Sequence, residues 1–503
     1  MRPSKVGKWR ALALIAVHVF ILAHIWHWLV KGETLSPLEP SEAMQTFELG
    51  RINAGFLLFA AAILLTLVFG RWFCGWACHM VALQDLAAWV LGKFGLFPRP
   101  VRSRLLVLAP WFVAGHMFGW PFFLHFFGDR QLPSPSTWRL DLGTDALWQT
   151  FPGPIMSVLS VLLAGLLIVW WLGAKGFCTH GCPYGAFFTI ADRFAPMRIK
   201  VSDACNHCGH CTHACRSNVR VHEEVAKHGR IVDPGCMKTL DCVSVCPMDA
   251  LHVGFAAPKP FAQSQQRIKS RADFSWPEEI LLAVVAFGTA EFVWRGAWFG
   301  ETVPFLLAVT LGVLTAVFTL LTLRLLTRRE LSFQHTLLKR DGRLTRAGRF
   351  GALLLLGWLL LTAHTALLQR LTPAALADAR EPVQAAFYGS RRVERAELER
   401  VLGQLEQVRS WSLLTDARVQ EVRALTLRGL GRHVDAEAAL VDAGGVGHTF
   451  VLPESALALA AYCMDPQRRR YDEAKRLITG VLRESPQHPI GLMLQEQLEQ
   501  LRR

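Results

Sequence analysis

Long apolar runs alternate with short polar loops through residues 1–372 of this chain. A bilayer core needs about 20 apolar residues per helix, and seven runs reach or approach that length. The segment 72–92 is also apolar, but cysteines, Gln84 and Asp85 interrupt it, so we expect it at the membrane interface. The pattern predicts a mainly α, polytopic membrane protein with spans at 11–30, 54–70, 105–125, 154–172, 279–298, 303–326 and 350–369.

The pattern changes to that of a soluble helical domain over 373–503. This stretch is rich in Ala, Leu, Glu and Arg, and its apolar positions recur at helical spacing. Residues 471–486, with a small Ala474 and a closing Pro486, resemble a tetratricopeptide repeat, and 431–438 is a fainter copy. A generic helical bundle is the alternative. Helical repeats bind partners, so we expect a partner protein to dock here.

Positive charge along the loops predicts the orientation. Lys and Arg number 4, 5, 13 and 8 in 1–10, 71–104, 173–278 and 324–349, but only 2, 2 and 1 in 31–53, 128–152 and 295–302. The positive-inside rule places the first group in the cytoplasm. Seven spans then leave the C-terminal domain on the periplasmic side of a bacterial inner membrane. These basic loops account for most of the net charge of +14, and nucleic-acid binding is not predicted.

The first span has basic residues before it, as a signal peptide would. It is too long for the apolar core of a signal peptide, and no small-residue cleavage site follows it. We therefore expect an uncleaved membrane anchor.

Seven cysteines lie in one short polar segment. They are spaced Cys-x2-Cys-x2-Cys-x3-Cys and then Cys-x5-Cys-x3-Cys-Pro, at Cys205, Cys208, Cys211, Cys215, Cys236, Cys242 and Cys246. The first spacing is typical of thiolates that wrap a cubane iron–sulfur cluster. A structural zinc site is the alternative, although zinc rarely uses this run of three short steps. The segment therefore predicts an α+β, bacterial-ferredoxin-like domain that carries two clusters.

The second half of this motif lacks one cysteine, because Thr239 stands where an intact copy would have it. In two-cluster ferredoxins the fourth cysteine of each motif ligates the other cluster. Cluster one would then use Cys205, Cys208, Cys211 and Cys246, and cluster two only Cys215, Cys236 and Cys242. The second site could hold a [3Fe-4S] cluster, a [4Fe-4S] cluster with a water ligand, or no cluster.

A second repeat lies at the cytoplasmic ends of two spans. Arg71-Trp-Phe-Cys74-x3-Cys78 matches Lys175-Gly-Phe-Cys178-x3-Cys182. If each copy is helical, the i,i+4 spacing puts both thiols on one face, and the two faces could supply four thiolates at one place. We expect a third redox or metal centre or a redox-active thiol pair, with thiol pKa values lowered by Arg71 and Lys175. The alternative is that these small side chains only pack helix ends.

Several histidines fall near the outer side of the membrane on this topology. They are His24, His27, His116, His125 and His364. Ionisable side chains inside spans are costly and often functional. His24, His27 and His116 could ligate a b-type haem or copper, or accept protons from quinol. The alternative is interfacial histidines that bond to backbone carbonyls.

These motifs together resemble the membrane-bound polyferredoxins of the NapH, NosR and CcoG (RdxA) type. The resemblance covers about 50–260 and rests on the two Cys-x3-Cys pairs and the seven ferredoxin cysteines. The chain departs from the pattern at His79, in place of a proline, at Thr239, and in its helical C-terminal domain.

The resemblance implies an electron-transfer component, not a stand-alone enzyme, that links a quinol pool or a cytoplasmic donor to a partner redox protein or metal. A redox-sensing or assembly factor for a respiratory enzyme is the alternative, with partners recruited by the C-terminal domain. We expect four parts: membrane helices with the Cys-x3-Cys pairs (1–198), the ferredoxin-like domain (199–262), further membrane helices (263–372) and the soluble helical domain (373–503).

Overall fold

The structure is a computed structural model that is mainly helical, as the sequence predicts. It describes residues 4–145, 147, 153–262, 273–298, 301–334, 336–413, 416–443, 450 and 452–502. Residues 263–272, where the second membrane part was expected to begin, lie outside this set. The chain divides into two compact units, Met1–Glu291 with Pro304–Trp358, and Phe292–Val303 with Leu359–Arg503.

Among the described residues, five helices are long and apolar enough to cross a membrane. They are α1 (Lys5–Lys31), Leu106–Phe127, Pro154–Leu172, α16 (Phe305–Thr327) and α17 (Arg346–Tyr388). The second comprises η2 (Leu106–Leu108), α6 (Ala109–Ala114), the π-helical η3 (Gly115–Gly119) and α7 (Trp120–Phe127). The third comprises α8 (Pro154–Ser160), the π-helical η6 (Val161–Leu167) and α9 (Ile168–Leu172).

The other two predicted spans fall on shorter helices. Span 54–70 is α3 (Ala54–Phe69), and span 279–298 falls largely on α15 (Trp276–Thr289) with its π-helical continuation η8 (Ala290–Trp294). The several apolar helices support membrane association, and the count of seven spans stays a prediction. The expected boundary between 372 and 373 lies inside α17, which continues through Pro373 and Pro382.

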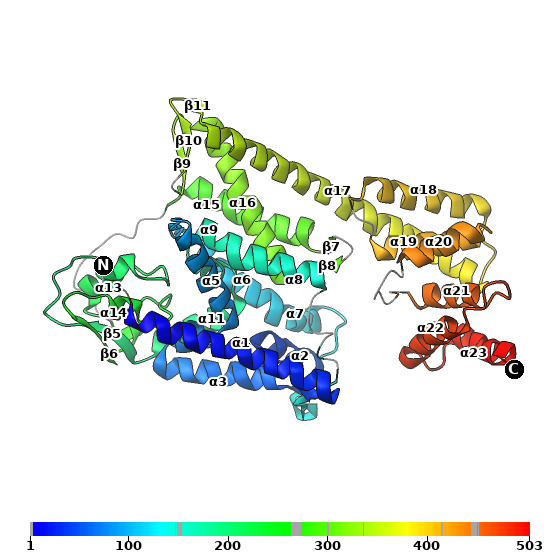
Figure 1. Cartoon of the computed structure of the whole chain (residues 1–503), viewed down its shortest axis with the longest axis horizontal. Helices are drawn as coiled ribbons and strands as arrows, with labels where there is room; N and C mark the ends of the chain where they lie inside the picture. The colour runs from blue at the N-terminus through cyan, green and yellow to red at the C-terminus, as the bar shows by residue number, and fades with distance from the viewer. Residues whose placement is uncertain are drawn as a thin grey trace. The chain divides into compact units, whose positions relative to one another are not determined.

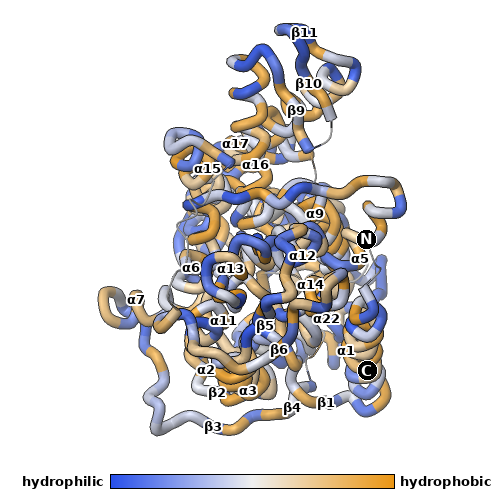
Figure 2. The backbone as a smooth tube through the Cα atoms, turned by 90° about the vertical axis from the view of Figure 1, so that its left-hand side faces the viewer, coloured by the Kyte–Doolittle hydropathy of each residue, from blue (hydrophilic) through white to orange (hydrophobic). Residues whose placement is uncertain are grey.

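The core of the first unit forms around α16. Its buried residues Leu314, Ala316 and Leu320 pack with Leu172 of α9 and Leu282 of α15. Gly312 permits the closest approach, because a methyl group there would overlap the carbonyl oxygen of Ala286 and lie 2.8 Å from the Ala290 Cβ. Small residues at such crossings let membrane helices pack backbone to backbone. The tube in Figure 2 is mostly orange along helices such as α3 and α9.

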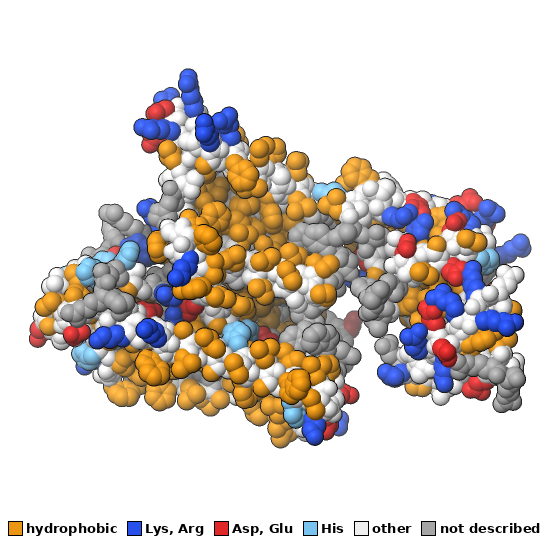
Figure 3. Space-filling view, viewed as in Figure 1, with side chains coloured by type: hydrophobic (Ala, Val, Ile, Leu, Met, Phe, Trp, Pro, Cys, Tyr) orange, Lys and Arg blue, Asp and Glu red, His pale blue; other side chains and the backbone are white. Residues whose placement is uncertain are grey.

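Large apolar side chains also cover the outside of this unit. On α1, Trp9, Phe20, Leu22 and Trp26 are each more than 60% exposed. Figure 3 shows apolar side chains spread over the face that carries α1 and α3. Soluble proteins rarely expose contiguous apolar surface of this extent, so the face is suited to contact with lipid.

Short helices and strands connect the apolar helices. The helices are η1 (Pro40–Glu42), α2 (Ala43–Leu49), α4 (Trp72–Trp76), α5 (His79–Lys93), η4 (Pro135–Thr137), α10 (Gly176–His180) and α11 (Pro183–Phe194). The strands are β1 (Thr34–Leu35) with β4 (Gly143–Thr144), β2 (Arg51–Ile52) with β3 (Arg139–Leu140), and β9 (Leu331–Phe333), β10 (Thr336–Arg340) and β11 (Arg343–Leu344).

The cysteine-rich insert lies between α11 and α15 along the chain (Figure 1). Its strands β5 (Met197–Val201) and β6 (Leu251–Phe255) pair antiparallel, with Ile199 opposite Val253. Between them lie α12 (His210–His213), α13 (Val221–His228) and α14 (Asp241–Ser244), and η7 (Lys259–Phe261) follows. The strands thus bring both ends of the insert together beside α11.

The described residues of Leu359–Arg503 in the second unit form a series of helices. Successive helices pack on one another around an apolar core in which Ala436 and Ala474 are fully buried. The helices after α17 are α18 (Arg395–Trp411), α19 (Ala417–Gly429), α20 (His433–Ala443), α21 (Pro453–Cys463), α22 (Tyr471–Glu484) and α23 (Pro489–Arg502), and β7 (Ala297–Trp298) pairs with β8 (Glu301–Thr302). The tetratricopeptide assignment stays a prediction.

Candidate metal centres

The first ferredoxin set consists of Cys205, Cys208, Cys211 and Cys246. These four cysteines line one cavity, together with Pro247 and residues of the 206–209 loop. Cys208 is exposed, whereas Cys246 is buried. The arrangement therefore brings a cysteine of the second motif to the three of the first, and it leaves one edge of this set at the surface.

The second ferredoxin set consists of Cys215, Cys236 and Cys242. Cys236 and Cys242 are each 6% exposed, and their thiols interact electrostatically with that of Cys215. Burial, followed by the nearby Cys236, raises the pKa of Cys215 to about 12. Thr239 is 5% exposed, so a threonine is enclosed where an intact motif would have a cysteine.

The backbone of the second motif repeats that of the first despite the missing cysteine. Left-handed residues occur at His207 (φ 56°) and Gly209 (φ 76°), and again at Lys238 (φ 52°) and Leu240 (φ 60°). Each residue of the second pair follows its counterpart in the first pair by the same number of positions that separates Cys236 from Cys205. A non-glycine residue rarely adopts a positive φ unless its surroundings require it. The second motif thus keeps the turn that wraps a cluster and lacks only the fourth thiol.

The membrane-face set consists of Cys74, Cys78, Cys178 and Cys182. The thiol of Cys182 interacts electrostatically with those of all three others, although the two pairs are far apart along the chain. Cys74 and Cys178 are 8% and 7% exposed. The structure therefore brings both copies of the repeat to one buried place at the ends of α3 and α9.

The two cysteines of each pair do not share one helix, so the condition for placing both thiols on one helical face is not met. Cys74 lies in α4 and Cys178 in α10, but Cys78 and Cys182 are the N-cap residues of α5 and α11, with ψ of 124° and 112°. Each pair therefore bridges a break between two helices. An N-cap position points its side chain at free backbone amides, which favour a negatively charged ligand.

The two copies of the repeat interlock through their basic residues. Lys175, which is fully buried, places its Nζ 2.7 Å from Oδ1 of Asp85 in the helix after the first pair. Arg71 donates to Thr189 Oγ1 (3.5 Å) in the helix after the second pair. Asp85 and Thr189 occupy equivalent positions after Cys78 and Cys182. The basic residue of each copy thus contacts the helix that follows the other copy, and the four cysteines form one site.

The expected lowering of the thiol pKa values is wrong for Cys78, Cys178 and Cys182. Burial, followed by the neighbouring thiols, raises the pKa of Cys78 to about 12 and that of Cys182 well above its ordinary value. Burial raises the pKa of Cys178 to about 11, although Lys175, Arg71 and a hydrogen bond from Gln84 Nε2 (3.0 Å) oppose the shift. Desolvation outweighs two adjacent cations here.

The chemistry of the membrane-face set fits a soft metal or an iron–sulfur cluster. It offers four sulfur donors in a buried place, with the cations of Arg71 and Lys175 beside them. A metal that displaces the thiol protons would remove the cost of burying free thiolates. Among the described residues, no three His, Cys, Asp or Glu side chains already stand as a metal-ligand group.

Two buried carboxylates connect the insert to the membrane helices. Asp192 accepts from Arg198 Nη1 (2.8 Å) and Lys238 Nζ (3.0 Å), and it is fully buried. Asp85 pairs with Arg10 (2.6 Å) and lies 3.6 Å from Arg216 of the insert. In the sequence, Asp85 only interrupts an apolar segment, and Asp192 belongs to no recognisable motif. The available signal was a carboxylate within an apolar helix, which is costly unless it is paired.

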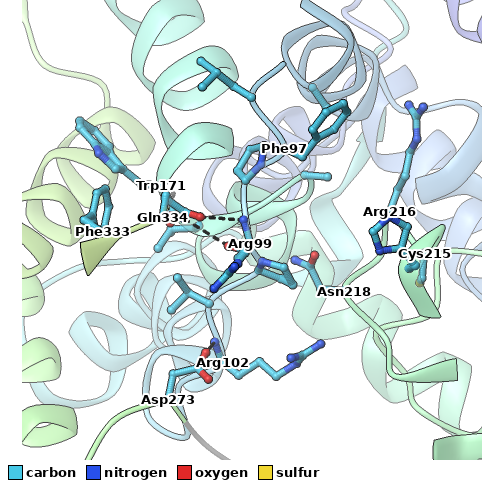
Figure 4. Close-up of a pocket in the computed structure, with 18 of the residues that line it drawn as sticks. Phe97, Arg99, Arg102, Trp171, Cys215, Arg216, Asn218, Asp273, Phe333 and Gln334 are labelled. Atoms are coloured by element: carbon cyan, nitrogen blue, oxygen red, sulfur yellow. Dashed lines mark hydrogen bonds between the residues drawn. The ribbon is translucent and has the colours of Figure 1, made fainter. Parts of the chain in front are cut away.

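A cavity of about 1110 Å³ lies between the insert and the membrane helices of the first unit. Figure 4 shows Cys215 and Arg216 on one wall and Trp171, Phe333 and Gln334 on another. Gln334 closes part of this second wall, because its amide accepts from Arg99 N (2.7 Å) and donates to Arg99 O (3.3 Å). One ligand of the second ferredoxin set therefore borders this opening.

The histidines of the outer side each have a local partner. His24 bonds to Leu35 O (2.7 Å), His27 to Thr34 Oγ1 (3.0 Å) and His125 to Arg130 O (2.9 Å). His364 bonds to Trp411 O (2.8 Å), and the ring of His116 stacks on Phe305. The carbonyl contacts of His24, His125 and His364 fit the interfacial alternative, whereas His27 bonds to a side-chain hydroxyl and His116 stacks on an aromatic ring. A haem or metal at His24, His27 and His116 stays a prediction.

Two family models match the cysteine-bearing segments. A model described as a 4Fe-4S binding domain matches residues 54–96 and 155–202, which contain the two Cys-x3-Cys pairs. A model described as a 4Fe-4S dicluster domain matches 197–247, which contains the seven ferredoxin cysteines.

Curated relatives match about 40–60% of the chain. The putative electron transport protein YccM of Escherichia coli is 24% identical over 318 residues, which are 57% of this chain and 84% of that protein. The methylamine utilization ferredoxin-type protein MauN of Methylorubrum extorquens is 28% identical, over 42% of this chain and 76% of its own length. The ferredoxin-type protein NapH of Escherichia coli is 24% identical, over 45% and 80%.

No solved structure matches the chain significantly. The predicted resemblance to NapH-type proteins is confirmed, whereas the tetratricopeptide part is not. Segments of the chain match models of 4Fe-4S binding domains, and the chain is similar to proteins named as ferredoxin-type and to a putative electron transport protein.

Proposed function

We propose that this protein is a membrane-bound electron-transfer component that moves electrons one at a time through three cysteine-bound iron–sulfur centres. The observation that carries the proposal is the gathering of eleven cysteines into three sets within one compact unit. The first ferredoxin set would hold a [4Fe-4S] cluster. The second would hold a [3Fe-4S] cluster, or a [4Fe-4S] cluster with a non-cysteine ligand.

The membrane-face set would hold a further [4Fe-4S] cluster. The matched segments 54–96 and 155–202 contain no cysteine other than Cys74, Cys78, Cys178 and Cys182. A cluster bound by these segments therefore has only these four thiolates available. The protein supplies a dry pocket and two cations, Arg71 and Lys175, which stabilise the negative charge of the ligated site.

The remaining parts suggest how electrons enter and leave. The membrane-face set follows the ends of the apolar helices α3 and α9, which supports a quinol in the lipid phase as its donor. The exposed Cys208 leaves the first ferredoxin set open to a soluble donor or acceptor. The helical C-terminal domain offers a surface for a partner redox protein.

The proposed orientation places the insert in the cytoplasm and the C-terminal domain in the periplasm of a bacterium. Alkaline phosphatase fused after the last residue should be active, whereas the same enzyme fused near Gly254 should be inactive. Activity of the Gly254 fusion alone would contradict this orientation.

The function is tested with the full chain purified from membranes. Iron analysis and EPR in both redox states should detect all three centres, and duroquinol should reduce them in proteoliposomes. Clusters that duroquinol does not reduce would favour the alternative, a redox-sensing or assembly factor that recruits partners through its helical domain. A chain without iron would contradict both.

A further inference from the structure

We propose that the second ferredoxin set exchanges electrons directly with the membrane-face set, and that the contact of Gly75 with Met237 couples them. Electrons from the membrane-face set would then reach the first ferredoxin set only through the second ferredoxin set. This order rests on the proposed function and goes beyond it, because neither the cysteine spacing nor the relatives indicate which ferredoxin set lies next to the membrane.

The contact joins the chain directly after one ligand of each set. Gly75 follows Cys74, and Met237 follows Cys236. A methyl group on Gly75 would overlap the carbonyl oxygen of Met237 and lie 3.3 Å from its carbonyl carbon. The backbones of α4 and of the cluster-binding loop are therefore in direct van der Waals contact.

Glycine is needed at position 75 for this approach and not for its own conformation. Gly75 lies within α4 and is not among the residues with positive φ. An alanine would fit its helical backbone well. Its only conflict would be with the backbone of Met237, which is 1% exposed and has no room to retreat freely.

Partly buried hydrogen bonds hold the two segments together. Trp76 Nε1 donates to the carbonyl of Lys238 (2.9 Å), and Arg71 Nη1 donates to the carbonyl of Pro234 (3.2 Å). Lys238 is 1% exposed and binds the fully buried Asp192 of α11. The loop that carries Cys236 is thus fixed to the residues around both Cys-x3-Cys pairs.

The first ferredoxin set differs in its surroundings. Its cavity is lined by the 205–211 loop, His222 and residues near Cys246, all within the insert. Cys208 is exposed, whereas Cys236 and Cys242 are buried. Because electron tunnelling slows steeply with distance, the buried set in contact with α4 is the natural neighbour, and the exposed set suits a soluble partner.

The transfer needs no bond change within the protein. A cluster held by Cys74, Cys78, Cys178 and Cys182 would be oxidised by one electron, and a cluster held by Cys215, Cys236 and Cys242 would be reduced by it. A hydroquinone from the lipid phase replaces it, giving two electrons in successive steps and releasing two protons. In the reverse direction the same steps run from a soluble reductant.

The test compares Gly75→Ala with a matched control, Gly92→Ala, in the full chain. A Cβ at Gly92 meets only Phe97, at an ordinary 3.6 Å. We expect Gly75→Ala to keep its iron, to weaken the magnetic interaction between the membrane-face and second centres, and to slow reduction of the insert by duroquinol about tenfold or more. Gly92→Ala should behave as wild type. Wild-type coupling and rate in an iron-replete Gly75→Ala protein would overturn the proposal.

A second pair of variants decides the order even if Gly75→Ala loses iron. In Cys208→Ser, duroquinol should still reduce the second set. In Cys236→Ser, it should fail to reduce the first set, which dithionite still reduces. Normal reduction of the first set in Cys236→Ser would contradict the order.

The failure of the proposed function is distinguishable. Absence of iron at the membrane-face set in wild type would contradict that function and this inference together. Magnetic coupling of membrane-face iron to the first set, and not to the second, in dithionite-titrated protein would contradict this inference alone.

Discussion

Two internal repeats supply the cysteines of this protein, and they build their sites in different ways. In the insert, each half shapes its own ligands through left-handed turns at His207 and Gly209, or at Lys238 and Leu240. In the membrane part, each pair bridges a helix break, and the site forms only when the ends of α3 and α9 meet. Local conformation therefore sets the ferredoxin sites, whereas packing of distant helices sets the membrane-face site.

The largest effect is expected from removing one membrane-face ligand. Cys74→Ser or Cys178→Ser should abolish quinol-linked electron transfer and leave both ferredoxin centres intact, because the ferredoxin sets use none of the membrane-face thiols. EPR of the insert clusters, recorded beside duroquinol-dependent reduction, measures both. Cys463→Ser, in the core of the C-terminal unit, is the control and should change neither. Normal transfer in both variants would mean that these thiols only pack helix ends.

Asp85→Ala tests the packing between the two Cys-x3-Cys copies without removing a thiol. Asp85→Ala leaves the buried Lys175 without its carboxylate, and loss of one partner of a buried pair costs about 3–5 kcal/mol. We expect a lower thermal unfolding midpoint and loss of membrane-face iron before insert iron. Glu399→Ala, which breaks an exposed pair with Arg395, should cost about 1 kcal/mol or less. Equal effects of the two changes would contradict the packing account.

Thr239→Cys tests whether the second ferredoxin set lacks only one ligand. Because the second motif keeps its cluster-wrapping turn, Thr239→Cys should convert a [3Fe-4S] EPR signal into that of a second [4Fe-4S] cluster without rearrangement. The membrane-face centre should be unaffected. Two fully cysteine-ligated cubanes in the unmutated insert would contradict the cross-ligation scheme.

The smallest effect is expected in the order in which the thiols are alkylated when no metal is bound. Burial raises the pKa of Cys178 to about 11 and that of Cys78 to about 12, so at pH 8 these thiols stay protonated. Since the thiolate is the nucleophile, alkylation should label the exposed Cys208 first and the membrane-face set last. Mass spectrometry of timed samples gives the order. Rapid labelling of Cys178 would show that the site is open to solvent.

The sequence was sufficient to predict the features that depend on local spacing. The two ferredoxin sets, the missing ligand at Thr239 and the repeated Cys-x3-Cys pairs all follow from positions along the chain. The apolar periodicity likewise predicts the helical membrane part. These features can be predicted because each depends on the type and spacing of residues within one short segment.

The features that depend on packing could not be predicted. The helix breaks at Cys78 and Cys182 arise where spans end and turn, which an i,i+4 spacing does not reveal. The pKa shifts followed burial and not the basic residues beside the thiols. The contact of Gly75 with Met237 joins segments distant in sequence, and only the folded chain brings them together.

The central claim is that the four membrane-face cysteines hold a metal centre of their own. The most direct measurement is iron per chain, by Mössbauer spectroscopy and chemical analysis, in wild type and in a variant with Cys74, Cys78, Cys178 and Cys182 all changed to serine. The account predicts loss of about four irons with the ferredoxin signals retained. Unchanged iron content in the folded variant would contradict it.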